Sequence, residues 1–177
     1  MTRLWRLARC ERGYSLIELL QVTVILGVVM TGLTVLFVQA SNAELQMNKR
    51  FQAQQEARVA IDRMRREIRC AKAVTPVGTS AAITVTLPAQ CPTAGGTEIT
   101  VVYDTQLVSA GRYELRRAGV RMADFVRVGT VFTYTSPSTS SLGSLRVDLP
   151  INIQPPGVAG SNWELVADMV LRNTNRA

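Results

Sequence analysis

Residues 12–38 read RGYSLIELLQVTVILGVVMTGLTVLFV, and this segment governs how the rest of the chain must be organised. Its last twenty residues, 19–38, carry no charge. As a helix they extend about 30 Å, the thickness of a bilayer hydrocarbon core. The apolar region of a cleaved secretory signal is usually shorter, about 7–15 residues. We therefore expect a membrane-spanning helix, although Val38-Gln39-Ala40 resembles a signal-peptidase site and an uncleaved signal anchor is a further alternative.

The charge that precedes this segment orients it. The chain as a whole has a formal net charge of +7. Residues 1–13 contribute +3 of it, from the four arginines at positions 3, 6, 9 and 12 against Glu11. Because cytoplasmic flanks of membrane helices are enriched in basic residues, residues 1–13 are expected in the cytoplasm and everything after Ala40 outside.

Glu18 is the unusual residue of the apolar segment. A carboxylate inside a membrane helix costs a few kcal/mol on insertion scales and usually has a partner. In the uncut chain Arg12 is the nearest candidate. A cut after Gly13 would instead create an ammonium group at Tyr14, four residues from Glu18, on the same or a neighbouring chain.

Residues 12–20, Arg-Gly-Tyr-Ser-Leu-Ile-Glu-Leu-Leu, resemble the processing signal of type IV prepilins and type II secretion pseudopilins. The resemblance implies that a prepilin peptidase cuts after Gly13 and that the same enzyme N-methylates Tyr14. It implies that Glu18 is an assembly contact. Tyr14 replaces the usual phenylalanine but keeps an aromatic ring. The implied partners are that peptidase, other pilin-like subunits, an inner-membrane assembly platform and membrane lipid.

Residues 41–72 contain no proline or glycine and continue as an amphipathic helix. The apolar positions fall mostly three or four apart, as on one helix face: Phe51, Ala57, Ile61, Met64, Ile68 and Ala71. The charged residues, Glu67 among them, are assigned to a solvated opposite face, with helical pairs such as Arg58/Asp62 and Asp62/Arg66. A basic amphipathic helix that binds lipid or nucleic acid is the alternative. The helix is expected to end before Thr75-Pro76.

Beyond Pro76 the pattern changes to alternating apolar and polar residues separated by turns, which is typical of strands. Strands are predicted at residues 82–87, 98–104, 112–117, 130–135, 145–153 and 163–172. Pro150 marks part of its run as an edge, and residues 119–124 are assigned to a loop. The predicted fold class is α+β: a long N-terminal transmembrane/amphipathic helix packed on an antiparallel β-sheet head, pilin-like.

The expected organisation is therefore a cytoplasmic leader at residues 1–13, a transmembrane and assembly half of the helix at 14–40, its amphipathic half at 41–75, and a β-rich head at 76–177. Cys10 falls in the leader, which leaves Cys70 and Cys91 as an even pair outside the membrane. An oxidising compartment favours a disulfide between them. A metal site or a reactive thiol is the alternative.

A second resemblance concerns the subunit type. Residues 55–69 (QEARVAIDRMRREIR) and the ending Val170-Leu171-Arg172-Asn173 are similar to those of larger minor pilins. The types meant are the J-type pseudopilin of type II secretion and the W-type minor pilin. This resemblance covers the helix well and the sheet in outline, and implies a minor, tip-associated subunit.

The sequence offers no pattern typical of an enzyme. It has no histidine, which is the commonest general base and metal ligand. No phosphate-binding, dinucleotide-binding or zinc-ligand spacing is found, so we expect no cofactor and no metal. The acidic residues beyond position 97, from Glu98 to Asp168, are interpreted as an ordinary solvated surface. Contact of the basic residues 112–121 with DNA is considered unlikely against solubility and subunit contacts.

The prediction is a structural pilin-like subunit. It is expected as a single-pass protein of the bacterial cytoplasmic membrane with its head outside, and then as part of a filament in the periplasm or outside the cell. The main alternative is a signal-anchored extracellular binding domain that does not polymerise. The sequence leaves open whether such a filament serves secretion, adhesion, motility or DNA uptake.

Overall fold

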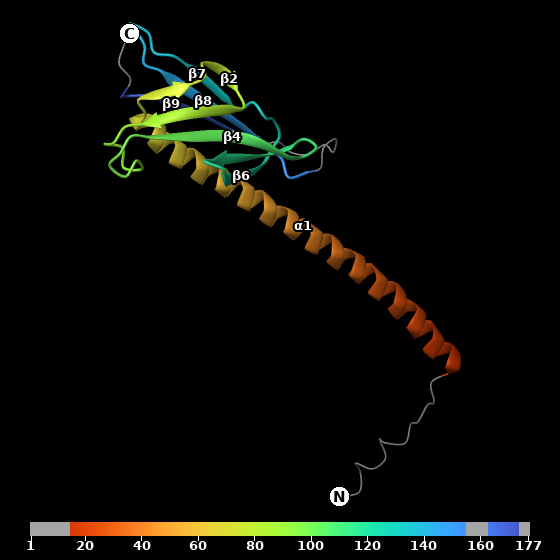
Figure 1. The fold of residues 1–177 in the computed structure, drawn as a ribbon. Helices are drawn as coiled ribbons and strands as arrows, with labels where there is room; N and C mark the ends of the chain where they lie inside the picture. The colour runs from red at the N-terminus through yellow and green to blue at the C-terminus, as the bar shows by residue number, and fades with distance from the viewer. Residues whose placement is uncertain (1–14, 155–162, 174–177) are drawn as a thin grey trace, which may run out of the picture. The chain divides into compact units, whose positions relative to one another are not determined.

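The computed structural model describes residues 15–154 and 163–173, and Figure 1 shows its elements in order. The chain divides into two compact units, residues 1–45 and 46–177, and each is considered by itself. Helix α1 (Leu16–Cys70) is 55 residues long and contributes to both units. The predicted leader, residues 1–13, and Tyr14 lie outside the described residues.

The described part of the first unit is helical and wholly exposed. Every residue from Ser15 to Leu45 is exposed, because no described residue of this unit packs over the helix. By length and composition α1 can cross a membrane, and none of its apolar window is buried. A helix that is apolar on all sides is stable only when lipid or other helices surround it.

The second unit packs the remainder of α1 against an antiparallel sheet. The nine described strands are β1 (Ala73–Thr75), β2 (Gly78–Ser80), β3 (Ala82–Leu87), β4 (Ile99–Ser109), β5 (Arg112–Arg117), β6 (Val120–Val126), β7 (Phe132–Thr135), β8 (Ser144–Ile151) and β9 (Trp163–Val170). Their order in the sheet is β1-β3-β4-β5-β6-β8-β7-β2, and β9 pairs with β8. Every pairing is antiparallel. The α+β prediction, with a long helix and an antiparallel sheet, is confirmed.

The core lies between α1 and the inner face of the sheet. In its packed part the helix first buries small residues and then, towards its last turns, larger ones: Ala53, Ala57, Ala60, Ile61, Met64 and Ile68. The sheet contributes alternate residues, as Leu145, Val147, Leu149 and Ile151 of β8 show. Alanines let the helix backbone approach the strands closely, while leucine and isoleucine fill the space farther along.

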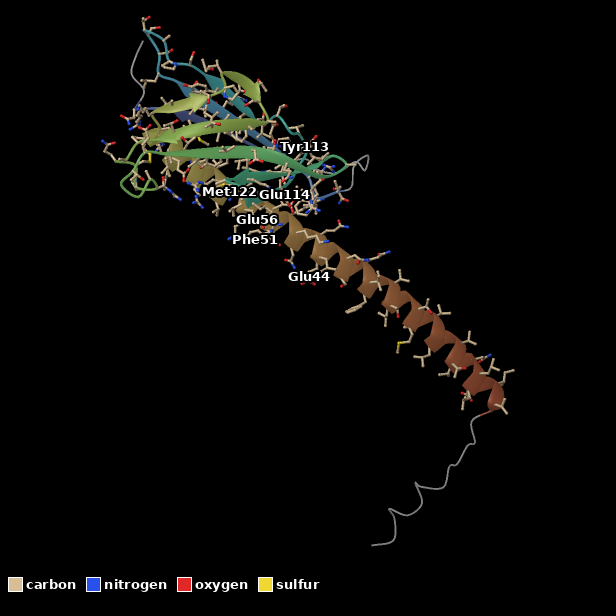
Figure 2. All side chains as sticks on the ribbon, viewed as in Figure 1. Glu44, Phe51, Glu56, Tyr113, Glu114 and Met122 are labelled. Atoms are coloured by element: carbon tan, nitrogen blue, oxygen red, sulfur yellow. A yellow bond between two sulfur atoms is a disulfide. The ribbon has the colours of Figure 1, made fainter. Side chains whose placement is uncertain are left out.

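Three predictions about α1 are wrong. Phe51, labelled in Figure 2, is 69% exposed and does not join the buried stripe, which passes through Ala53 instead. Glu67, assigned to the solvated face, is completely buried. Asp62 pairs with Arg65 at 3.1 Å rather than with the residues four positions away on either side. The prediction from large apolar residues misplaced the stripe, because the stripe begins with alanines.

Two predictions about the sheet are also wrong. Residues 120–126 form strand β6 rather than part of a loop, and its irregular register with β5 hides the alternation that would have revealed it. Pro150 lies in β8, which is flanked by β9 on one side and by β7 and β6 on the other. The carbonyl of Pro150 accepts a hydrogen bond from the Arg127 backbone N–H. The missing N–H of Pro150 faces the same side, where β6 and β8 share a single residue pair, so little pairing is lost.

Candidate functional site

The candidate assembly segment, which the structure describes over residues 15–40, begins where α1 begins. The backbone carbonyl of Ser15 accepts hydrogen bonds from the N–H groups of Glu18 and Leu19, at 2.9 and 3.2 Å. Ser15 therefore occupies the capping position, and the Ser-x-x-Glu spacing is typical of a helix start. A carboxylate in the first turn also interacts favourably with the positive end of the helix dipole. Local sequence thus begins the helix at this point and places Glu18 within its first turn.

Glu18 has no side-chain partner among residues 15–154 and 163–173. Its side chain is exposed, and within the described part of the chain no ion pair or side-chain hydrogen bond engages it. The surrounding side chains are large and apolar: Leu16, Ile17, Leu19 and Leu20 are each more than half exposed. A carboxylate in such surroundings requires a cation from elsewhere when the segment leaves water.

The polar side chains farther along the segment are satisfied by the helix itself. The hydroxyl groups of Thr23, Thr31 and Thr34 donate to the carbonyls of Leu20, Gly27 and Met30, each at 2.8 Å. Hydroxyls bonded in this way present their methyl groups outward. The surface of the segment is therefore almost entirely apolar, apart from Gln21 and Glu18.

Two glycines interrupt this surface. A Cβ atom added at Gly27 or Gly32 would meet nothing within 4 Å, so packing within the described residues does not require glycine at either position. Glycine in membrane helices is used where another helix backbone approaches closely. Neither glycine is therefore accounted for by contacts among the described residues.

The second unit holds a buried ionic cluster that sequence reasoning missed. Glu67 of α1 accepts a 2.6 Å hydrogen bond from the hydroxyl of Tyr103 on β4. The guanidinium of Arg117 on β5 donates a 3.1 Å hydrogen bond to the same carboxylate and forms an ion pair with it at 3.0 Å. Arg63 forms a further ion pair at 3.5 Å. Burial, reinforced by the neighbouring carboxylate, raises the pKa of Tyr103 well above its ordinary value.

This cluster joins helix to sheet. Burial lowers the tendency of Arg117 to stay charged, but its bonds to Glu67 outweigh that effect and raise its pKa. Arg117 therefore stays a charged guanidinium, and Tyr103 stays a neutral phenol. The sequence held a signal for the burial of Glu67, because Glu67 lies three residues from Met64 and one from Ile68, on the apolar stripe of the helix. Glu67 is a structural group and is enclosed by its partners.

A second cluster lies on the neighbouring strands β5 and β6. Arg112 of β5 binds both carboxylate oxygens of Asp124 on β6 and lies over the ring of Phe125, 4.3 Å from its centroid. Burial opposes ionisation of Asp124, but Arg112, the Phe125 N–H and Arg121 together lower its pKa. Glu114 bonds Arg116 at 3.0 Å. Glu114 and Asp124 are buried, so their interpretation as ordinary solvated acids is wrong. Each of these acids is neutralised by arginine.

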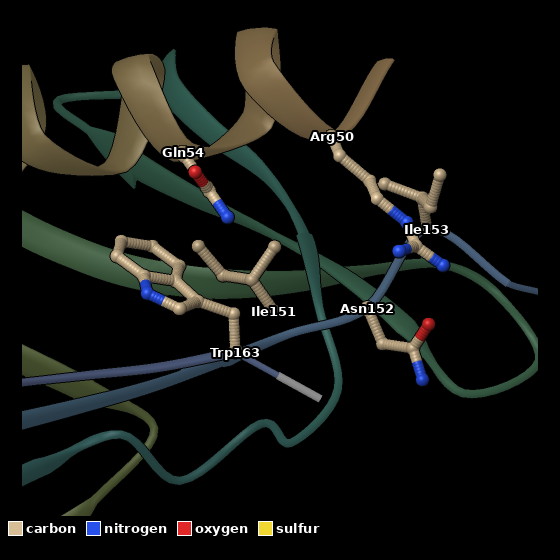
Figure 3. A pocket seen from close by; sticks show the side chains of 6 residues that line it. All are labelled: Arg50, Gln54, Ile151, Asn152, Ile153 and Trp163. Atoms are coloured by element: carbon tan, nitrogen blue, oxygen red, sulfur yellow. The ribbon is translucent and has the colours of Figure 1, made fainter. Parts of the chain in front are cut away.

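A small cavity in the second unit has no acid or nucleophile in its lining. It measures about 80 Å³ and is lined by Arg50, Gln54, Ile151, Asn152, Ile153 and Trp163, between α1, the end of β8 and the start of β9 (Figure 3). Its polar side chains carry one guanidinium, two amides and the indole N–H of Trp163, and the Asn152 amide oxygen already accepts from the Gln154 N–H. Acid–base or nucleophilic catalysis needs groups of another kind.

The predicted staple between helix and sheet is confirmed. Cys70, the last residue of α1, forms a disulfide with Cys91, which follows β3, across a Cα–Cα distance of 5.8 Å. This pairing leaves neither thiol for the metal or redox alternatives. No group of three or more His, Cys, Asp or Glu side chains that could hold a metal ion is found in residues 15–154 and 163–173.

The fold and the apolar segment together define a class: a membrane-anchored α+β protein with an N-terminal apolar helix. The comparison with protein families specifies it further. Residues 8–34 match the prokaryotic N-terminal methylation motif, so the chain carries the type IV prepilin/pseudopilin signal. Residues 15–34 of the described structure lie within that match. Proteins with this signal are structural subunits, processed by prepilin peptidase and assembled with other pilin subunits.

Neither a curated protein nor a solved structure matches the chain. The motif covers the signal and the apolar segment as far as Thr34, and it does not extend into the rest of the helix or the sheet. Of the predicted site residues, Gly13 and Tyr14 fall inside the matched motif but outside the described structure. Glu18 falls inside both.

Proposed function

We propose that this chain is a minor pilin or pseudopilin subunit that is cleaved after Gly13, N-methylated at Tyr14 and assembled through its apolar helix into a filament. The observation that carries the proposal is the combination of the methylation motif with a Glu18 that has no side-chain partner among the described residues, in an apolar segment of α1 that is exposed throughout. A neighbouring subunit with the same kind of helix would cover the apolar surface and bring a cation to Glu18.

Glu18 has a defined role in this proposal. Once Tyr14 becomes the first residue, its ammonium and the Glu18 carboxylate of a neighbouring subunit pair in an apolar bundle. Low dielectric strengthens the attraction, while desolvation offsets much of it. The pairing therefore fixes the register and order of addition more than it adds stability. Methylation keeps the positive charge on the amine, so the pairing survives modification.

A minor subunit is supported by the helix sequence at residues 55–69, which is similar to those of J-type pseudopilins and W-type minor pilins. A nine-stranded head is also a large elaboration for a subunit that must be repeated many times. The precursor is placed in the cytoplasmic membrane with its head outside, since the basic leader orients it that way.

The experiment that tests this proposal is intact-mass and N-terminal analysis of the protein from native membranes. The expected mature chain begins at Tyr14 and carries one added methyl group. Gly13→Val should leave a chain that begins at Met1, because a branched side chain blocks the tight turn of the scissile backbone. Gly27→Ala is the matched control and should be cleaved normally.

A wild-type chain that begins at Met1 or at Ser41 would mean ordinary anchoring or ordinary secretion, and the proposal would be abandoned. A processed chain that never appears in sheared filaments would retain the cleavage and methylation but reject assembly.

A further inference from the structure

Strand β9 forms a long edge of the sheet. Its eight residues, Trp163–Val170, pair along their whole length with β8, and no other described strand pairs with β9 (Figure 1). An edge strand presents a row of N–H and C=O groups that can extend the sheet into another chain. By comparison, the edge strands β1 and β2 have three residues each.

The outer face of β9 is acidic. Its inward residues belong to the core, while Glu164, Val166, Asp168 and Val170 point outward. Asp148 of β8 pairs with Val166 and is therefore the diagonal cross-strand neighbour of Glu164, and the Asp148 carboxyl group raises the pKa of Glu164. Arg146 of β8, 3.9 Å from Asp168, is the basic residue among these side chains. The group Asp148, Glu164 and Asp168, here called the acidic edge, is thus left with excess negative charge.

This excess is local, because buried acids elsewhere on the sheet are matched. On β5 and β6, Glu114 and Asp124 lie within 4 Å of three arginines: Arg112, Arg116 and Arg121. On β8 and β9 the three carboxylates meet one arginine. Exposed carboxylates that repel one another are relieved by a cation from a partner.

The acidic edge makes a second copy of β9 an unsuitable partner. If two copies paired antiparallel through β9 with Val166 opposite Val166, each Glu164 would face the other copy's Asp168. Like charges directly opposite each other destabilise a strand pair. A shift that centres the pair on Ala167 moves these acids only to diagonal neighbours. The sequence of β9 therefore resists pairing with a second copy of itself.

We propose that β9 is a docking edge for an extended, lysine- or arginine-bearing strand of a different pilin-like subunit, which it recognises by backbone pairing and by the acidic edge. The partner's identity as a neighbouring subunit rests on the proposed function. An eight-residue edge binds weakly alone, but subunits held in one membrane meet at high effective concentration, which makes a weak, selective contact sufficient.

The first test reverses one charge in the full chain, held in detergent micelles. Glu164→Lys makes β9 self-complementary, because the introduced lysine of each copy would then face Asp168 of the other copy. We expect this variant to dimerise by sedimentation analysis, with new hydrogen-exchange protection on β9 amides and weaker association at high salt. The wild-type chain and the double variant Glu164→Lys/Asp168→Lys should remain monomeric. Glu44→Lys, an equal charge change outside the sheet, is the control.

The second test uses a defined probe for the cationic partner. A nine-residue peptide of alternating threonine and lysine should protect β9 amides of the wild-type chain, while its threonine–glutamate counterpart should not. Glu164→Lys/Asp168→Lys should weaken the lysine peptide about tenfold, as expected from losing two cross-strand charge pairs. Reversed preference, with the glutamate peptide bound by the double variant, would support the proposal further.

Failure has a distinct signature. A Glu164→Lys chain that stays monomeric with unchanged β9 exchange, or equal protection by both peptides, would overturn the docking edge. Neither result involves Gly13 or Tyr14, so cleavage and methylation can be correct when the edge is wrong. Conversely, an unprocessed chain with a functional cationic-strand site would overturn only the assignment of the partner.

Discussion

Two glutamates on the same helix, Glu18 and Glu67, illustrate opposite ways of accommodating a carboxylate among apolar residues. Glu67 is completely buried and its partners come from two strands of its own sheet, with contacts of 2.6 to 3.1 Å. Glu18 is exposed and has no side-chain partner within the described part of the chain. One half of α1 is completed by the chain's own sheet, and the other half is exposed for something else to cover.

The comparison teaches that burial inside a fold and burial between molecules leave different marks on one helix. The head half carries alanines where strands approach, and its charged group is enclosed by named donors. The N-terminal half carries glycines at which an added Cβ would meet no atom within 4 Å, and threonines whose hydroxyls donate to carbonyls of the same helix. Substitutions in the first should change the free energy of unfolding, and those in the second should change assembly.

The largest expected effect is at Glu18. Glu18→Gln keeps the size and removes the charge, so a charge pair between subunits would be lost at a cost of about 2 kcal/mol or more. We expect at least about a thirtyfold drop in incorporation into sheared filaments relative to the membrane pool. Glu44→Gln, exposed on the same helix, is the control and should incorporate normally. Equal incorporation of both variants would remove Glu18 from assembly.

The corresponding change in the head is Glu67→Ala. It leaves the Arg117 guanidinium, whose side chain is 16% exposed, without its carboxylate. Removing one partner of a buried ion pair costs about 3 kcal/mol. Urea unfolding of the full chain in detergent, followed by tryptophan fluorescence, should show this loss while incorporation per folded molecule is unchanged. Asp62→Ala breaks the exposed pair with Arg65 and should cost less than about 1 kcal/mol.

If Glu67→Ala and Asp62→Ala destabilise the protein equally, the cluster does not join helix and sheet as described. Replacing both ionic partners, as in Glu67→Met/Arg117→Leu, should recover part of the loss, because no unpaired charge remains buried.

Alkaline pH sharpens the same comparison through Tyr103. Its pKa is raised in the folded chain, so the folded state holds the phenolic proton more tightly than the unfolded state. That stability is fully present below about pH 10, the ordinary tyrosine pKa, and is lost as pH rises above it. Tyr103→Phe should lose about 1–2 kcal/mol at neutral pH and show a shallower decline above pH 10. Parallel alkaline declines for wild type and variant would count against the Tyr103–Glu67 contact.

The smallest effect is expected at Phe51. Because its side chain is 69% exposed, Phe51→Ala should change the free energy of unfolding by less than about 0.5 kcal/mol. Ile68→Ala, at a fully buried position of the same helix, should cost about 2–5 kcal/mol. Similar urea midpoints for the two variants would mean that Phe51 packs against the head after all.

The sequence predicted the parts of the molecule that depend on local pattern. The apolar helix, the α+β class, the Cys70–Cys91 disulfide and the strands at residues 82–87 and 112–117 are all confirmed. Each signal lies in a few neighbouring residues: an uncharged run, an even pair of exported cysteines, or simple alternation. The roles of Gly13, Tyr14 and Glu18 stay predictions.

What sequence reasoning missed depends on contacts between distant segments. Glu67 looked like one more charge on a solvated helix face, because its partners Tyr103 and Arg117 lie 36 and 50 positions away. Strand β6 was hidden by two register irregularities with β5. Pro150 was assigned to an edge because proline cannot donate a backbone hydrogen bond. It is accommodated inside the sheet because β6 and β8 share a single residue pair beside it, and that arrangement depends on the whole sheet.

The threonine hydroxyls of the apolar segment bear on how such a helix exchanges one solvent for another. Thr23, Thr31 and Thr34 already donate to carbonyls of their own helix, so none of the three gains or loses a hydrogen bond when lipid chains are replaced by side chains. Lipid tails and leucine side chains are about equally apolar, and transfer between them carries little hydrophobic free energy. Direction must then come from shape at Gly27 and Gly32 and from the charge of Glu18. A segment built in this way can leave a membrane at low cost and return to it at low cost.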